Sequence, residues 1–203
     1  MGMRLLRWPL YRPHASRRQV RGRDAGIEVL YRQRVRVGLP LAVLCAWLAE
    51  PSPSSLVLGA LIALLGVVVR GLAASHLPKH AGLATSGPYA LTRNPLYFGS
   101  AVVAAGLLVA AHSWIAGALG AIYFAVFYPP TMRREERRLR ARYGAAFDDY
   151  AARVPRFWPR LAGAPSAGFA WSWGLYGRNG EYTAAAGVLI GLALLWLKMW
   201  SAS

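Results

Sequence analysis

The sequence predicts an all-α protein, a polytopic transmembrane helical bundle of about five spans. Apolar residues make up 56% of the 203 residues and charged residues only 16%, whereas charged residues are about 25% of a typical soluble domain. The apolar residues form long runs. The 24 Lys and Arg residues outnumber the 8 Asp and Glu residues and lie mostly between those runs. This alternation is typical of a membrane protein rather than of a nucleic-acid-binding protein, so no nucleic-acid partner is expected.

Five apolar stretches are candidate spans, at residues 35–49, 54–75, 97–111, 114–131 and 182–200. A helix needs about 20 residues to cross the hydrocarbon core. The second and fifth stretches are long enough by themselves, and the other three depend on extension or pairing. A turn cluster from Glu50 to Ser54 joins the first two spans, and only His112 and Ser113 separate the third from the fourth. The latter spacing predicts a tight helical hairpin, and the dense Gly and Ala predict close helix packing.

The positions of the basic residues predict the topology. Lys and Arg gather in the N-terminal segment and in residues 76–96 and 132–181, and are absent from the turns at residues 50–54 and 112–113. By the positive-inside rule the basic segments lie in the cytosol. The N-terminus is then cytosolic and the C-terminus outside, in a bacterial-type inner membrane. Arg70, inside the second span, is expected to snorkel to the interface, with an internal partner as the alternative.

The chain divides into three expected regions. Residues 1–34 form a basic cytosolic segment, residues 35–160 a membrane core of four spans with two cytosolic motif segments, and residues 161–203 an interfacial stretch with the fifth span. Cys45 is the one cysteine. A disulfide within the chain and a thiolate metal site are therefore excluded, and no metal ligand is predicted.

The first motif segment precedes the third span. Gly87-Pro88 predicts a turn, and Asn94-Pro95 predicts a break directly before the next helix. Proline fits the first turn of a helix because the missing N–H has no partner there in any case. The open N–H groups of this helix start, beside the guanidinium of Arg93, predict a binding place for a carboxylate.

The second motif segment follows the fourth span. Glu135 and Glu136 lie on the predicted helix where it leaves the membrane. Gly144 predicts a break, after which residues 147–152 form a short helix that ends at Val154-Pro155. The alternative for the two glutamates is a solvated helix face, paired with neighbouring arginines such as Arg138 and Arg140.

These two segments together resemble the isoprenylcysteine carboxyl methyltransferase family, which is related to the phospholipid N-methyltransferases. The first is GPYxxxRNPxYxG, from Gly87 to Gly99, and the second is EExxLxxxYG followed by VPRFxP, from Glu135 to Pro159. The resemblance implies a membrane enzyme whose cytosolic loops and short helices bind S-adenosylmethionine. The residues that it implies for cofactor binding are His80, Gly87, Tyr89, Arg93, Asn94, Pro95, Tyr97, Gly99, Glu136 and Tyr150. The implied catalytic residues are Arg134 and Glu135. Many relatives have His in place of Asn94, and Asn cannot carry a proton at neutral pH.

The predicted function is methyl transfer from S-adenosylmethionine to a lipophilic or lipidated acceptor at the cytosolic membrane face, with carboxyl O-methylation as the first choice. A carboxylate acceptor needs no general base, whereas an amine must arrive neutral. Three alternatives stay open. They are phospholipid N-methylation, a nicotinamide-dependent membrane reductase of the sterol-reductase type, and a non-catalytic scaffold whose basic loops bind anionic lipid. Anionic headgroups are expected partners of those loops in every case.

Overall fold

The computed structural model describes residues 17–77, 82–160 and 171–201, and within these residues every regular element is a helix. The prediction of an all-α fold is therefore confirmed. The helices are α1 (Arg17–Trp47), α2 (Pro53–Ser75), α3 (Pro88–Leu91), α4 (Pro95–Ala111), α5 (Trp114–Tyr143), α6 (Ala145–Arg153), α7 (Trp173–Asn179) and α8 (Tyr182–Ser201).

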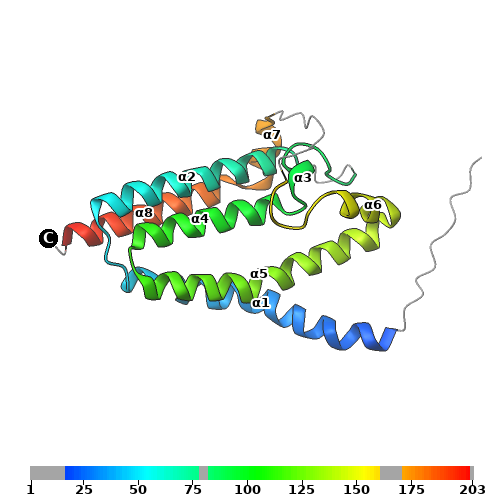
Figure 1. Ribbon diagram of the computed structural model, residues 1–203, viewed down its shortest axis with the longest axis horizontal. Coiled ribbons are helices and arrows are strands. Elements are labelled where there is room, and N and C mark those ends of the chain that lie inside the picture. Colours follow the sequence, from blue (N-terminus) through cyan, green and yellow to red (C-terminus); the bar gives the residue numbers. More distant parts are fainter. Residues whose placement is uncertain (1–16, 78–81, 161–170, 202–203) are drawn as a thin grey trace, which may run out of the picture.

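The long helices run roughly along one axis. Helices α2, α4 and α8 pack together, α5 packs against α1, and the short helices α3, α6 and α7 gather at one end (Figure 1). The C-terminus and the last turn of α1 lie at the opposite end. The basic motif segments therefore share one end of the bundle, as the positive-inside pattern requires.

All five predicted spans are helical. Within the described residues, α2, α5 and α8 are long and apolar enough to cross a membrane, and α4 is a shorter apolar helix of 17 residues. The first predicted span is the last part of α1, which begins as early as Arg17. The expected region boundary after residue 34 therefore falls inside a continuous helix. No proline interrupts residues 17–34, so nothing local ends the helix there.

Glycines bring α2 and α4 into backbone contact. A Cβ atom added at Gly106 would lie 2.4 Å from the Ala63 nitrogen, and one added at Gly66 would lie 2.6 Å from the Val103 nitrogen. Small residues allow this approach in lipid, where helices gain little from hydrophobicity alone. The close helix packing predicted from the dense Gly and Ala is thus confirmed between α2 and α4.

The tight turn between the third and fourth spans is confirmed. His112 adopts the left-handed conformation with φ 51°, and the Ser113 side chain caps α5 by accepting from the Ala116 N–H. Beyond this turn α4 packs mainly against α2 and α5 mainly against α1.

Helix α5 bends at two consecutive prolines (Figure 1). Pro129 and Pro130 lack the N–H groups that would continue the helical ladder, which bends a helix at that place. The Thr131 hydroxyl donates to the Phe127 carbonyl at 2.7 Å. The bend directs the end of α5 that carries Glu135 and Glu136 toward the loop before α4.

Candidate functional site

A turn at Gly87 leads into the site. Gly87 has φ 59°, and a Cβ atom there would lie 2.3 Å from the His76 ring. The predicted turn is present, but it continues directly into the one-turn helix α3. Asn94 then precedes α4, and Pro95 is in its first turn, as predicted.

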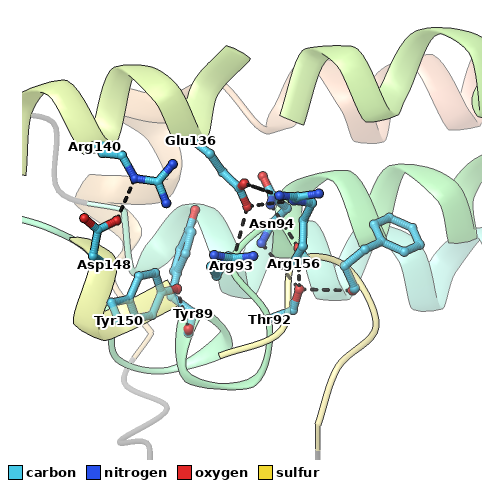
Figure 2. Close-up of polar contacts among 10 residues, drawn as sticks. Tyr89, Thr92, Arg93, Asn94, Glu136, Arg140, Asp148, Tyr150 and Arg156 are labelled. Carbon is cyan, nitrogen blue, oxygen red and sulfur yellow. Dashed lines mark hydrogen bonds and ion pairs between the residues drawn. The ribbon is translucent and has the colours of Figure 1, made fainter. Parts of the chain in front are cut away.

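The loop before α4 is joined to the segment after α6. The Arg93 N–H donates to the Pro155 carbonyl at 2.9 Å, and the Asn94 side-chain amide donates to the Arg156 carbonyl at 2.9 Å. The Thr92 hydroxyl donates to the same Arg156 carbonyl at 3.2 Å (Figure 2). The Asn94 side-chain amide is therefore hydrogen-bonded to a backbone carbonyl. These bonds bring the two sequence motifs together.

Glu136 is the centre of a buried ion cluster. Its carboxylate lies 3.3 Å from Nε of Arg93 and 2.8 Å from Nη2 of Arg156 (Figure 2). The side chains of Glu136 and Arg93 are only 7% and 12% exposed. Nε of Arg93 is buried and, despite this proximity, makes no hydrogen bond. The alternative of a solvated, arginine-paired face does not describe Glu136.

Glu135 points elsewhere. It is exposed, and its carboxylate accepts from the Tyr97 hydroxyl at 2.8 Å. Successive residues of a helix point about 100° apart, so α5 directs one glutamate into the ion cluster and the other toward α4.

A cavity of about 850 Å³ lies between α1, α2, α4 and α5. Six predicted site residues line it, namely Tyr89, Arg93, Asn94, Pro95, Tyr97 and Glu135. The sequence reasoning missed other polar lining residues, which are Arg34, Arg70, Ser100, Tyr123, Tyr128 and Arg138. Three of them could have been predicted from the sequence, because Arg34, Tyr128 and Arg138 lie at or near the cytosolic ends of predicted spans. Val35, Leu39 and Ala42 of α1 add an apolar side.

The other predicted site residues do not line this cavity. Gly87 and Gly99 pack closely against other residues, since a Cβ atom at Gly87 would lie 2.3 Å from the His76 ring and one at Gly99 would lie 2.6 Å from Cγ of Arg70. Glu136 is in the ion cluster, and Arg134 is half-buried on α5. Tyr150 lies outside the cavity too. His80 falls outside the described residues.

Tyr150 supports the cavity wall from behind. Its hydroxyl donates to the Tyr89 carbonyl at 2.7 Å. Burial raises the pKa of both tyrosines well above the ordinary value. Both hydroxyls therefore stay protonated at physiological pH, which suits them to hydrogen bonding and not to acting as bases.

Arg70 has the partner inside the protein that was expected as the alternative to snorkelling, and the position of its guanidinium relative to the membrane interface stays a prediction. Its Nε and Nη2 atoms each donate to the Glu181 carboxylate at 2.9 Å, across 111 positions of sequence. A cation inside a span needs such a partner because hydrocarbon does not solvate it.

A family model described as phospholipid methyltransferase matches residues 71–146. The matched residues contain the first motif, α4 and the whole of α5. Arg156 and Glu181 lie beyond the matched residues.

Three relatives match parts of the chain. The nickel-cobalt-cadmium resistance protein NccN of Alcaligenes xylosoxydans xylosoxydans is 42% identical over 84 residues, which are 41% of this chain and 39% of that protein. The cobalt-zinc-cadmium resistance protein CzcN of Cupriavidus metallidurans is 39% identical over 113 residues, 55% of this chain and 52% of that protein. Protein-S-isoprenylcysteine O-methyltransferase B of Arabidopsis thaliana is 28% identical over 118 residues, 54% of this chain and 58% of that protein.

These matches confirm the resemblance on which the site residues were predicted. The chain spans between about two fifths and three fifths of the length of these relatives. No solved structure matches the chain significantly. Within the described residues, no group of three or more His, Cys, Asp or Glu side chains is placed to hold a metal ion.

Proposed function

We propose that the chain transfers a methyl group from S-adenosylmethionine to a lipophilic acceptor at the cytosolic face of the membrane, giving a carboxyl methyl ester. The two-sided lining of the cavity carries this proposal. Arg93, Glu135 and the start of α4 give it a polar end, whereas Val35, Leu39 and Ala42 give it an apolar side. A charged cofactor and a hydrophobic acceptor need these two environments next to each other.

The polar end fits the groups of the cofactor. Arg93 lines the cavity directly before the N-cap of α4, and a guanidinium beside the N–H groups of a helix start suits a carboxylate. Glu135 offers acceptor oxygens for amino or hydroxyl groups. Tyr89, Tyr97 and Tyr128 provide aromatic surface for a base. The volume of about 850 Å³ is within the usual range of ligand sites, about 300–1,000 Å³.

The chain's own contribution is positioning. The cofactor would supply a methyl group bonded to a sulfonium. The acceptor oxygen would bond to that methyl carbon while the opposite C–S bond breaks and S-adenosylhomocysteine leaves. Holding the two reactants in a dry site provides much of the acceleration. Among the described residues that line the cavity, four are arginines and one, Glu135, is a carboxylate. Arg70 and Arg93 face the carboxylates of Glu181 and Glu136. Arg34 and Arg138 still outnumber Glu135 in the lining, so the cavity favours an anionic acceptor over a protonated amine.

A second candidate is N-methylation of a phospholipid headgroup. The description of the matching family model favours it. An amine acceptor must lose a proton before it attacks, and Glu135 is the carboxylate of the cavity lining that is placed to accept one. The two candidates differ in the chemical bond that they form.

The experiment uses purified full-length protein in lipid nanodiscs with S-adenosylmethionine labelled in the methyl group. A prenylated cysteine and phosphatidylethanolamine are offered as acceptors in separate reactions. Alkali releases methanol from a methyl ester but leaves an N-methyl group in place, so the product identifies the bond. Label in neither acceptor, with no cofactor binding, would refute methyl transfer.

Glu135→Gln is expected to lower turnover about tenfold or more, since the charge is lost and the shape is kept. The matched control is Asp149→Asn, which neutralises an exposed carboxylate of α6 that does not line the cavity. Equal activity in both variants and in the unchanged protein would show that the Glu135 carboxylate has no role in the reaction.

The proposed topology has its own test. We expect the N-terminus in the cytosol and the C-terminus outside the inner membrane, with exposed arginines such as Arg133 and Arg142 facing anionic headgroups. A reporter that is active only in the cytosol should work when fused after Arg160 and fail when fused after Ser203. Activity at both positions would mean that α8 does not cross.

A further inference from the structure

A buried ion pair ties α8 to the cavity. Both Arg70 nitrogens that face Glu181 lie 2.9 Å from its carboxylate oxygens, and the side chains are 22% and 9% exposed. Arg70 lines the cavity. Glu181 directly precedes α8 and lies beyond the matched residues.

The rest of the Arg70 guanidinium is bonded to the beginning of α4. Its Nη1 donates to the Leu96 carbonyl at 3.4 Å and to the Ser100 hydroxyl. The Ser100 hydroxyl in turn donates to the Leu96 carbonyl at 2.8 Å. Gly99 allows this approach, because a Cβ atom there would lie 2.6 Å from Cγ of Arg70. Arg70 therefore connects Glu181 to the first turns of α4.

The segment before α8 is itself fixed on the end of α2. The Asn179 side-chain amide donates to the Ala74 and Leu77 carbonyls at 2.8 and 3.1 Å. The Trp171 ring lies close over Gly71. These contacts fix the segment before α8 on α2 and so keep the Glu181 carboxylate next to the Arg70 guanidinium.

We propose that Glu181 is a positioning residue for cofactor binding. It fixes Arg70, and Arg70 fixes the start of α4, the helix whose N-terminus and Tyr97 form the polar end of the cavity. The inference rests on the proposed function. It extends the site beyond residues 71–146, because the start of α4 keeps its position only when Glu181, from the segment before α8, pairs with Arg70.

A purely structural role would behave differently from a positioning role. Replacing both members of a buried ion pair by apolar residues is often neutral for stability, whereas removing one member leaves a buried charge without a partner. The double variant Arg70→Met with Glu181→Leu should therefore fold, yet it lacks the hydrogen bonds that Arg70 donates to Leu96 and Ser100. In this variant a positioning role lowers the affinity for the cofactor without lowering the stability of the fold.

The experiment measures the affinity of full-length variants for S-adenosylmethionine in nanodiscs, without an acceptor, together with the thermal unfolding midpoint. Glu181→Gln and the double variant are compared with Lys198→Met. Lys198 is on α8, the helix that follows Glu181, but it donates to the Ala46 and Trp47 carbonyls at the opposite end of the bundle. It thus controls for the loss of a charge and of backbone contacts on α8.

We expect the double variant to bind about tenfold more weakly at a nearly unchanged unfolding midpoint, which is a usual size for coupled neighbours. Glu181→Gln should bind weakly and unfold earlier, and Lys198→Met should bind normally. Normal affinity in the double variant would overturn the positioning role. Failure of the unchanged protein to bind would instead refute the proposed function. If the double variant does not fold, the pair is structural and the inference is wrong.

Discussion

Glu136→Gln is expected to lower the free energy of unfolding by about 2–4 kcal/mol, because it removes the anion from a buried cluster of two arginines. Arg93 is 12% exposed and keeps its charge next to a neutral amide. Arg156 is 44% exposed and turns toward solvent more easily, which keeps the loss below that of a fully buried pair. The change is measured by equilibrium unfolding in mixed detergent micelles.

The matched control is Asp148→Asn. Asp148 accepts from Arg140 at 2.6 Å, and both side chains are 54% exposed (Figure 2). An exposed pair contributes little because water and salt screen it, so this variant should lose about 0.5 kcal/mol or less. Similar losses in the two variants would show that burial does not distinguish the two carboxylates and that the ion cluster does not hold the motifs together.

The long helices could be predicted because a membrane span is a local pattern. A run of apolar residues satisfies its own backbone only as a helix, wherever its neighbours lie. The turn at His112-Ser113 and the first-turn position of Pro95 follow from equally local chemistry. The early start of α1 at Arg17 did not follow, since a polar helix carries no apolar signal.

The individual roles of the two glutamates could not be predicted. Their neighbouring positions imply that they point in different directions, but the direction of each depends on the bend at Pro129-Pro130. It depends as well on Arg156, which comes from a separate segment. The sequence therefore predicted a polar cytosolic site without separating Glu136, in the ion cluster, from Glu135, at the cavity.

The partner of Arg70 could be predicted from the sequence only in part. An arginine inside a span needs an anion, and the chain has only 8 acidic residues. Glu181 is one of them and precedes a span on the side where the second span ends. The choice among them requires the packing of α8 against α2, which no short-range pattern encodes.

Arg93→Ala is expected to weaken binding of S-adenosylmethionine by about 10–100-fold, the usual loss for a charge-assisted contact to a carboxylate. Arg93 lines the cavity and stands directly before Asn94, the N-cap of α4. Arg93→Lys should recover only part of the affinity, because an ammonium keeps the charge but lacks the fork of the guanidinium. Affinity is measured by equilibrium dialysis below the unfolding temperature.

Two controls separate this loss from general effects. Arg153→Ala removes an exposed arginine of α6 that does not line the cavity, and it should bind normally. Loss of Arg93 also removes one partner of Glu136, yet Arg156 keeps its contacts to that carboxylate at 2.8 to 3.0 Å. The variant should therefore stay folded. If folded Arg93→Ala protein binds the cofactor as tightly as the unchanged chain, the cofactor carboxylate does not bind at the start of α4. The polar end of the cavity then binds a different group.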